Sequence, residues 1–371
     1  MSHPPLSRRR FLGVSAAAAG LLAGARLNLT AAESQVVASP KIPRWRGFNL
    51  TEMTGGHRGQ RFHERDFEWM ADWGFTFARI PMSYWCWSSP ENWMQIDESA
   101  FAPLDEAIAF GKRYGIHLNL NLHRIPGYCV NGREKEPYQL FDSPHDSMER
   151  ALEAAVHHWT FIARRYQHLP STQVSFDLFN EPPWMKDQTR YVEIATRLVS
   201  AIRSVSPDRI IFADGADIGQ TPVMGLAHMG LVQSTRGYLP KMISHYTATW
   251  VPPAEFESTA TPTWPMRDKT GRLWDRETLW QELYLKWKPL VDLGVPVHVG
   301  EWGCFNHTPR AAMMGWMHDI LSVWKEAGWG WAMWNLRGAF GVVDSARPGT
   351  RYETFQGHQL DREMLELLRA N

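Results

Sequence analysis

Two glutamates stand in short sequence contexts that suit paired carboxylate chemistry. Glu181 lies in an Asn-Glu-Pro sequence, and Glu301 lies in a Gly-Glu-Trp-Gly sequence. A carboxyl group that keeps its proton can donate it to a departing oxygen, whereas an ionised carboxylate can attack an electrophilic carbon. The two residues therefore predict a reaction that uses both states together, provided that the fold brings them to one place.

Further polar and aromatic residues occur where short apolar runs end, at positions where a core residue would otherwise be expected. A guanidinium can hold a carboxylate ionised, an imidazole or an amide can hydrogen-bond hydroxyl groups, and an indole offers a flat apolar face. The candidates of these kinds are Arg79, His123, Asn180, His245 with the adjacent Tyr246, and Trp334. They form one site only if the ends of their strands lie side by side.

The elements that must position these residues follow from an alternation of short apolar runs with longer segments of helical period, which is typical of βαβ units. Eight strands are predicted at residues 46–50, 75–80, 116–122, 174–179, 209–213, 241–245, 295–300 and 330–334. Helices are predicted at 64–73, 101–114, 147–166, 189–205, 276–293, 309–327 and 361–369, and the Gly-rich segment 218–230 is only weakly helical. Eight strands close a barrel, so we predict an α/β fold, a (β/α)8 TIM barrel with a single catalytic domain.

In such a barrel the carboxyl ends of all strands converge on one face, so residues after the fourth and seventh strands meet across the mouth. Opposed carboxylates are what cleavage of a glycosidic bond requires, and a separation of about 5 to 5.5 Å leads to retention of the sugar's configuration. The alternative is that Glu181 or Glu301 forms a buried ion pair with an arginine. The sequence contexts of the two glutamates favour the catalytic interpretation.

Six stretches match a known family in order and spacing, namely residues 46–50, 77–81, 122–127, 179–182, 299–303 and 331–334. They resemble glycoside hydrolase family 5, the cellulase and mannanase family, over nearly the whole chain from residue 46 to residue 334. The resemblance implies that Glu181 is the general acid/base and that Glu301 is the nucleophile of a retaining glycosidase.

The same resemblance implies roles for the other candidates. Asn180 would hydrogen-bond the hydroxyl next to the anomeric carbon, and Arg79 would hold Glu301 ionised, although a purely structural salt bridge is an alternative for Arg79. His123 and His245 would line the site, and Trp334 would be the floor on which a sugar ring stacks. Further sugar-stacking candidates are Trp85, Trp87, Trp184, Trp250, Trp264 and Trp302.

The sequence departs from the family pattern after the predicted sixth strand. Family members usually carry His-x-Tyr there, with the tyrosine contacting the nucleophile, whereas here His245 is followed directly by Tyr246 and Thr247. Either Tyr246 takes the tyrosine's role, with Ser244 at the usual histidine position, or Thr247 has replaced the tyrosine. A long irregular segment, residues 247–273, follows, and a loop of that length is usually functional.

Composition and the N-terminal residues limit the partners. The 39 Lys and Arg balance the 39 Asp and Glu, so we expect a neutral carbohydrate substrate and no nucleic-acid partner. Three arginines at 8–10 precede a short apolar run, which predicts a twin-arginine export signal at 1–32, a lead-in at 33–44 and the hydrolase domain at 45–371. We expect a periplasmic or extracellular monomer without a membrane span in the mature chain.

Three cysteines, Cys86, Cys129 and Cys304, have neither the even count of a disulfide framework nor the C-x2-C spacing of a zinc site, so we expect buried or half-buried thiols. No Gly-rich phosphate loop and no G-x-S-x-G elbow occurs, and we expect neither a metal nor an organic cofactor.

The expected function is endoglucanase-like hydrolysis of a β-linked poly- or oligosaccharide. The alternatives are another glycan, such as a mannan, a glycolipid or a furanoside, and a barrel that binds glycan without cleaving it.

Overall fold

The computed structural model describes residues 37–55, 59–252 and 260–371. The export signal predicted at residues 1–32 lies outside the described residues. The chain from Val36 to Asn371 forms one compact unit. Within the described part of the chain, no helix combines the length and the apolar character that crossing a membrane requires.

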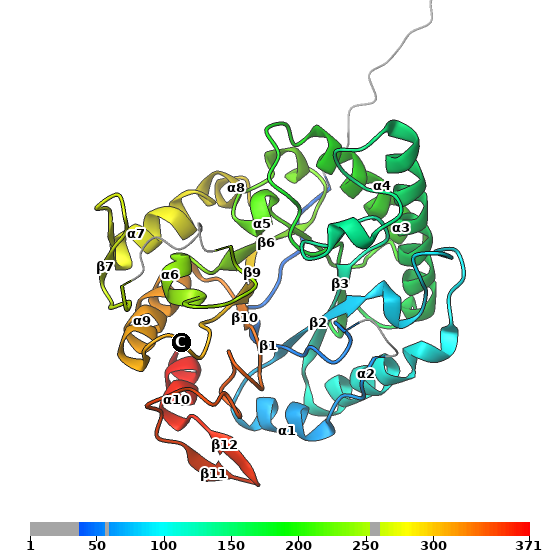
Figure 1. The fold of residues 1–371 in the computed structure, drawn as a ribbon. Coiled ribbons are helices and arrows are strands. Elements are labelled where there is room, and N and C mark those ends of the chain that lie inside the picture. The colour runs from blue at the N-terminus through cyan, green and yellow to red at the C-terminus, as the bar shows by residue number, and fades with distance from the viewer. Residues whose placement is uncertain (1–36, 56–58, 253–259) are drawn as a thin grey trace, which may run out of the picture. The chain divides into compact units, whose positions relative to one another are not determined.

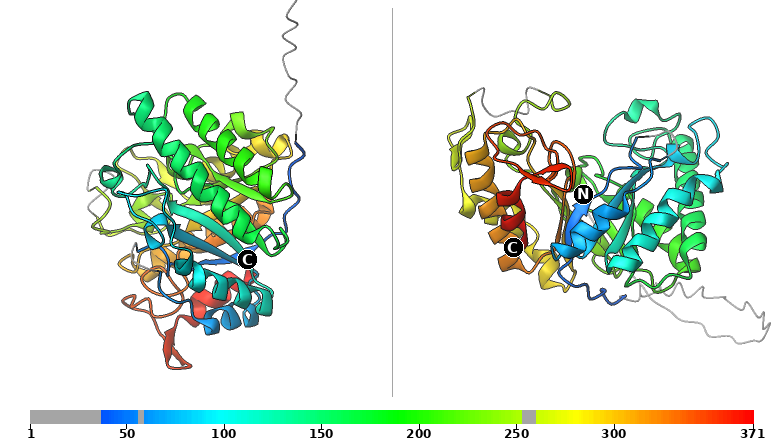
Figure 2. Two further views of the ribbon diagram at one scale, coloured as in Figure 1. Left: turned by 90° about the vertical axis from the view of Figure 1, so that its right-hand side faces the viewer. Right: turned by 90° about the horizontal axis from the view of Figure 1, so that it is seen from below.

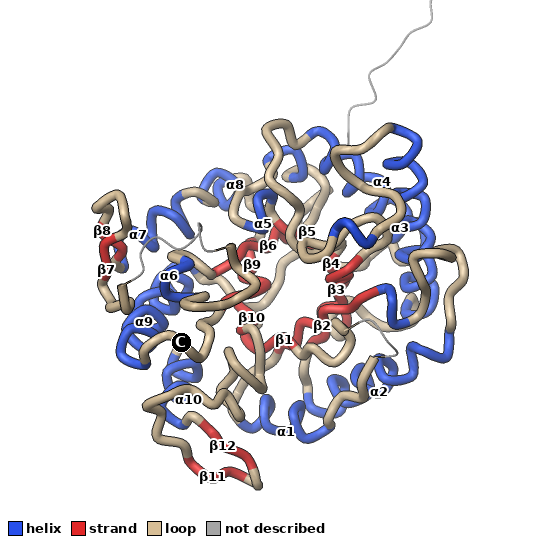
Figure 3. The backbone as a smooth tube through the Cα atoms, in the orientation of Figure 1, coloured by secondary structure: helices blue, strands red, loops and turns tan. Residues whose placement is uncertain are grey.

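Eight parallel strands form a closed barrel, which confirms the predicted (β/α)8 architecture (Figures 1 and 3). Each strand pairs with its neighbours in parallel, and β10 returns to pair with β1. The barrel strands are β1 (Arg46–Asn49), β2 (Phe77–Ser83), β3 (His117–Arg124), β4 (Val174–Asp177), β5 (Ile211–Asp214), β6 (Val232–Gly237), β9 (Val297–Trp302) and β10 (Trp331–Met333).

Helices surround the barrel, and the long helices α3 and α4 lie side by side on its outside (Figures 1 and 2). The helices have ordinary capping residues. Gly115 caps the C-terminus of α2 and Gly328 that of α9, both with the left-handed φ that glycine adopts without strain. The Asp361 side chain caps the N-terminus of α10. The longer helices are α1 (Glu64–Asp72), α2 (Ala102–Tyr114), α3 (His145–Tyr166), α4 (Thr189–Val205), α9 (Arg310–Ala327) and α10 (Arg362–Ala370).

Short helices and two hairpins complete the connections. The predicted helix 276–293 is divided into α7 (Arg276–Leu279), a π-helical turn Trp280–Leu285 and α8 (Lys288–Asp292), and the weakly helical segment 218–230 holds only the end of α5 (Ala216–Gly219) and one 3-10 turn. A hairpin of β7 (Met266–Arg267) and β8 (Leu273–Trp274) lies at the end of the segment predicted to be irregular, and β11 (Glu353–Phe355) pairs with β12 (His358–Leu360).

The sixth strand was predicted at residues 241–245, and that prediction is wrong. The strand is β6, Val232–Gly237, whereas Lys241–Ser244 forms the short helix α6 behind Pro240. The reason is that β6 is buried but largely polar. The Gln233 amide is satisfied by both backbone groups of Val223, at 3.0 and 2.8 Å, and the Thr235 hydroxyl by the Gly219 carbonyl at 3.2 Å. A search for an apolar run does not find such a strand.

Candidate active site

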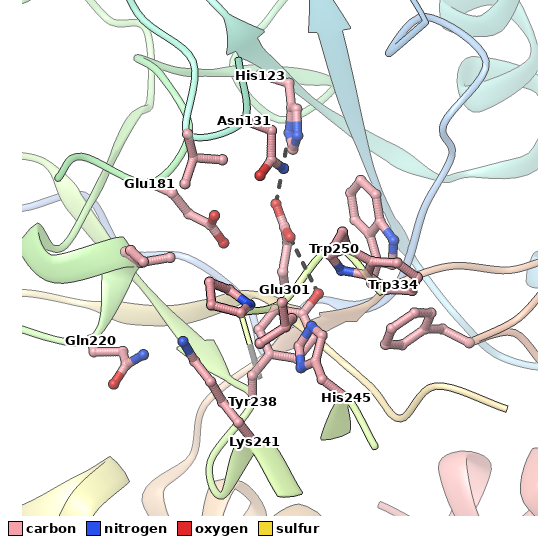
Figure 4. A pocket seen from close by; sticks show the side chains of 15 residues that line it. His123, Asn131, Glu181, Gln220, Tyr238, Lys241, His245, Trp250, Glu301 and Trp334 are labelled. Carbon is pink, nitrogen blue, oxygen red and sulfur yellow. Dashed lines mark hydrogen bonds and ion pairs between the residues drawn. The ribbon is translucent and has the colours of Figure 1, made fainter. Parts of the chain in front are cut away.

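A cavity of about 550 Å³ opens at the carboxyl ends of the barrel strands and contains both predicted glutamates (Figure 4). Glu181 follows β4, Glu301 belongs to β9, and the two side chains line the same cavity although they come from distant parts of the sequence. The lining residues are His123, Val130, Asn131, Glu181, Ile218, Gln220, Tyr238, Lys241, His245, Trp250, Val251, Pro252, Glu301, Trp334 and Phe340.

Glu301 is surrounded by groups that favour its ionised form. Arg79 Nη1 donates to Glu301 Oε1 at 2.5 Å, Arg236 Nη2 lies 3.5 Å from the same oxygen, and the Tyr238 hydroxyl donates to Oε2 at 3.3 Å. Burial alone would raise the pKa of Glu301, but the charges of Arg236 and Arg79 outweigh burial and hold the pKa below its usual value. The carboxylate is therefore ionised at neutral pH.

Glu181 is held at both its backbone and its side chain. Its φ is 51°, in the left-handed region that non-glycine residues seldom occupy. This conformation is fixed by the Asp214 carboxylate, which accepts from Glu181 N at 2.8 Å, and by the Tyr128 hydroxyl, which donates to Glu181 O at 2.6 Å. Arg236 Nε donates to Glu181 Oε1 at 3.0 Å. The surrounding contacts stabilise a backbone conformation that places the carboxyl group in the cavity.

The two carboxyl groups have opposite proton affinities. Burial, and next the negative charge of Glu301, raise the pKa of Glu181 to about 7, whereas the pKa of Glu301 is lowered. Near neutral pH a substantial fraction of the molecules thus carries a protonated Glu181 beside an ionised Glu301. Pairs of carboxyl groups whose environments separate their pKa values in this way can act as acid and nucleophile.

Asn180, next to Glu181 in the chain, is fully buried and does not itself line the cavity, and one of its polar groups has no hydrogen-bond partner among the described residues. Its Oδ1 accepts from Arg79 Nη2 at 2.9 Å and from Arg236 Nη2 at 2.8 Å, which fixes the orientation of the amide. The Nδ2 group is buried and has no protein partner in the described structure. A buried donor without a partner carries a desolvation cost, and a ligand hydroxyl at this place would satisfy it.

His123 and Trp334, both predicted from sequence, lie together on one wall of the cavity. Their rings are stacked, with centroids 5.6 Å apart and an interplanar angle of 24°. His123 Nδ1 lies 4.0 Å from Glu301 Oε1, but burial lowers the pKa of His123 to about 4, so the imidazole is neutral and forms no ion pair at neutral pH. His245 also lines the cavity, and its Nδ1 lies 2.8 Å from the Ser244 hydroxyl.

Tyr246 does not have the position that the sequence predicted. It packs against the hydrophobic core as a partly buried residue and is not among the cavity-lining residues, and the Thr247 hydroxyl contacts His307 at 2.7 Å. The tyrosine that contacts the nucleophile candidate is Tyr238, directly after β6. The shifted register of the sixth strand explains both differences, because the true strand ends at Gly237.

Four residues of the buried network were missed by sequence reasoning: Arg236, Tyr238, Asp177 and Asp214. Asp177 Oδ2 accepts from Arg79 Nε at 2.9 Å, and burial together with Asp214 raises the pKa of Asp177 to about 6. One sequence signal was present, because Arg236-Gly237-Tyr238 has the spacing of His-x-Tyr with arginine in place of histidine. The two aspartates close apolar strands and have no such signal.

The other tryptophan candidates fall into different environments. Trp250 lines the cavity and is 52% exposed, Trp184 is 69% exposed outside the lining, and Trp87 and Trp302 are buried. Trp85 lies under the Arg124 guanidinium at 4.0 Å, and Trp264 donates to Asp319 at 2.9 Å. Only Trp250 therefore joins Trp334 in the cavity.

None of the three cysteines lines the cavity. Cys86, Cys129 and Cys304 are buried thiols without a disulfide, as predicted. Across residues 37–55, 59–252 and 260–371, no group of three or more histidine, cysteine or acidic side chains is arranged to hold a metal ion.

Comparisons with known proteins agree with the fold. The family model for cellulase (glycosyl hydrolase family 5) matches residues 36–339. Endoglucanase C of Acetivibrio thermocellus is 24% identical over 74% of this chain and 83% of the relative, and cellodextrinase A of Ruminococcus flavefaciens is 25% identical over 71% and 75%. A crystal structure of a glycoside hydrolase is 36% identical, covers 88% of this chain and 99% of its own, and has a TM-score of 0.82. The chain belongs to glycosyl hydrolase family 5 and is a glycosidase.

Proposed function

We propose that this glycosidase cleaves a neutral, β-linked poly- or oligosaccharide with retention of configuration, with Glu301 as nucleophile and Glu181 as general acid/base. The observation that carries the proposal is the pairing of an ionised Glu301 with a Glu181 whose pKa is raised to about 7, both in contact with the Arg236 guanidinium. A double displacement needs these two states in the free enzyme.

In the first step the Glu301 carboxylate attacks the anomeric carbon while the bond to the glycosidic oxygen breaks. Glu181 gives its proton to that oxygen, so the leaving group departs as a neutral alcohol and Glu181 becomes a carboxylate. The sugar is then held as an ester of Glu301. In the second step Glu181 takes a proton from water, the water oxygen bonds to the anomeric carbon, and Glu301 is released as a carboxylate.

Asn180 and four residues of the cavity lining offer groups that suit a neutral sugar. The unpartnered Asn180 Nδ2 is available to the hydroxyl next to the anomeric carbon, and such a hydrogen bond strengthens as charge develops in the transition state. Trp334 and Trp250 provide aromatic faces, and the amides of Asn131 and Gln220 provide hydroxyl partners. The names of the relatives, endoglucanase and cellodextrinase, favour a β-glucan as the substrate class.

Azide rescue tests the assignment of both carboxylates. On an aryl cellobioside with a good leaving group, we expect azide to restore turnover of Glu181→Ala and to give the β-glycosyl azide, because azide attacks the ester on Glu301. Glu301→Ala should give the α-glycosyl azide, because azide then replaces the nucleophile. NMR of the products distinguishes the two anomers. Inversion by the unaltered enzyme, or the same azide anomer from both variants, would overturn the proposal.

We also propose that the protein is exported by the twin-arginine route, because Arg8, Arg9 and Arg10 directly precede the apolar run 11–25. Replacing all three arginines by lysine should leave the protein in the cytoplasmic fraction, whereas the unaltered chain should reach the periplasm or the medium. Export of the lysine variant at the unaltered rate would contradict the proposal.

Activity measured on a panel of glucans, mannans and glycolipids in the same fractions would identify the substrate.

A further inference from the structure

Arg236 is the cation that the two carboxyl groups of the cavity share. We infer that Arg236, fixed by Asp214, is a positioning residue for both steps of the reaction. In the first step it orients Glu181 for proton transfer. In the second step, when Glu301 has become an ester, its positive charge stabilises the Glu181 carboxylate. The inference rests on the proposed double displacement and adds to it a residue that links the two steps.

The guanidinium of Arg236 lies within contact distance of both carboxyl groups of the reacting pair and of Asn180. It is 1% exposed and donates from Nε to Glu181 Oε1 at 3.0 Å, from Nη2 to Asn180 Oδ1 at 2.8 Å, and lies 3.5 Å from Glu301 Oε1. Arg79, the second guanidinium that donates to this carboxylate network, donates to Glu301 but directs its Nε to Asp177. Arg236 is thus placed to act on Glu181 as well as on Glu301.

Asp214 fixes this guanidinium and the backbone of Glu181 together. It is fully buried, accepts from Arg236 Nη1 at 3.0 Å and also from Nη2, and accepts from Glu181 N at 2.8 Å. One carboxylate therefore sets the position of Glu181 relative to Arg236. Gly300 leaves room for this arrangement, because a Cβ at residue 300 would lie 2.9 Å from Arg236 Nη1.

The titratable groups around Glu181 come from six strands. Arg79 lies on β2, His123 on β3, Asp177 on β4, Asp214 on β5, Arg236 on β6 and Glu301 on β9, while Tyr128 and Tyr238 contact the two glutamates as neutral hydroxyls. His123 is neutral at the pH of interest because burial lowers its pKa to about 4. Two guanidinium charges thus face the carboxylates of Asp177, Asp214 and Glu301 when Glu181 is protonated.

Ester formation changes this balance in a direction that favours the second step. Glu301 loses its negative charge when it bonds to the sugar, so one of the causes that raise the pKa of Glu181, next after burial, is gone and Arg236 has lost one of its anionic partners. The guanidinium keeps its own proton throughout the pH range in which Glu181 titrates. It then stabilises the Glu181 carboxylate that must accept the proton of water.

Three variants of the full-length enzyme separate charge from geometry. Arg236→Gln removes the cation and should move both limbs of the pH dependence of kcat/KM upward by about one unit, because both carboxyl groups lose the same stabilising charge. Asp214→Asn removes an anion and should move the alkaline limb downward. Arg236→Lys keeps the charge but loses the fixed fork of donors, so we expect limbs close to the original and a kcat about tenfold lower.

The second step is read out separately by mass spectrometry. With an aryl cellobioside whose first step is fast, Arg236→Gln should accumulate a glycosyl ester on the peptide that contains Glu301 at pH 6, because Glu181 then holds its proton and cannot activate water. Arg209→Lys is a matched control, since Arg209 is buried at the opposite end of the barrel and donates to the carbonyls of Val174, Tyr166 and Leu169. It should leave the pH limbs unchanged.

The outcomes distinguish this inference from the proposed function. If no variant and no trapping condition yields an ester on Glu301, the double displacement itself is wrong. If the ester forms but Arg236→Gln and Asp214→Asn leave the limbs in place, or move the alkaline limb in the same direction, only the inference is overturned. If Arg236→Gln fails to fold, the other two variants still test the inference. For Asp214→Asn we expect the alkaline limb of kcat/KM to move downward, and for Arg236→Lys we expect it to stay in place.

Discussion

The two ends of the barrel interior differ sharply in what they bury. At the carboxyl ends of the strands lie Arg79, Arg236, Asp177 and Asp214 with the two glutamates, all with little or no exposure. At the amino ends the interior is filled by a separate apolar cluster of Trp45, Phe77, Phe212, Val232 and Ala332. One barrel thus combines an ionic interior and an aromatic interior within the length of its strands.

The histidines of the apolar end show how the environments differ. Trp45 stacks on His117 with ring centroids 3.8 Å apart, and burial lowers the pKa of His117 to about 4 and that of His298 to about 3. Both imidazoles are therefore neutral. The other end retains two guanidinium and three carboxylate charges, because each of them lies beside a group of opposite charge. Buried ion pairs contribute little net stability, so the apolar end stabilises the fold and the ionic end provides chemistry.

The largest effect should follow from a change at the ionic end that leaves the fold intact. We expect Glu301→Gln to lower kcat by at least roughly three orders of magnitude, because the amide is a poor nucleophile, while thermal unfolding stays within a few degrees of the original. Steady-state kinetics on a soluble glucan and differential scanning calorimetry measure both. Near-normal turnover would remove Glu301 from the mechanism.

A change at the apolar end should have the opposite result. Phe77→Ala creates a cavity in the cluster and should lower the free energy of unfolding by about 3 to 5 kcal/mol. KM and kcat, measured below the unfolding transition, should remain within a factor of two. A large loss of kcat with unchanged denaturant unfolding would show that the two ends are not separate in function.

The ionic end should also reduce stability in a pH-dependent way. The pKa of Glu181 is raised from 4.5 to about 7 in the folded state, so ionising this carboxyl lowers the free energy of unfolding. This loss of stability is absent below pH 4.5 and complete above pH 7. Glu181→Gln, which keeps an acceptor for Arg236, should therefore stabilise the fold by about 3 kcal/mol at pH 8 and by little at pH 4. Urea unfolding at both pH values tests the sign, and a gain confined to the acidic side would refute it.

The smallest effect concerns the rim of the ionic end. Trp250→Ala should raise KM about tenfold with little change in kcat, because an aromatic face in the cavity is lost. Trp184→Ala is the matched comparison, as this more exposed ring does not line the cavity, and it should change KM less than twofold. Equal effects of the two variants would extend the sugar-binding surface beyond the cavity.

Sequence reasoning succeeded where burial is apolar and failed where it is polar. Seven barrel strands were predicted within a few residues, because their side chains form apolar runs between helices. The strand β6 was missed because Gln233, Thr235 and Arg236 are buried with hydrogen-bond partners outside the strand, and Ser234 is buried against Arg236 of the same strand. In sequence, such a polar run resembles a loop. The displaced strand then placed the tyrosine at Tyr246 instead of Tyr238.

The sequence by itself determined the barrel, the family and the two glutamates, because strand periodicity and short motifs are local properties of the chain. Only the tertiary structure decided which cation the glutamates share and which neighbouring groups raise the pKa of one and lower that of the other. Those properties depend on distances between β4, β5, β6 and β9, and on the low dielectric of a closed interior, where a charge a few ångströms away shifts a pKa. No local pattern contains that information.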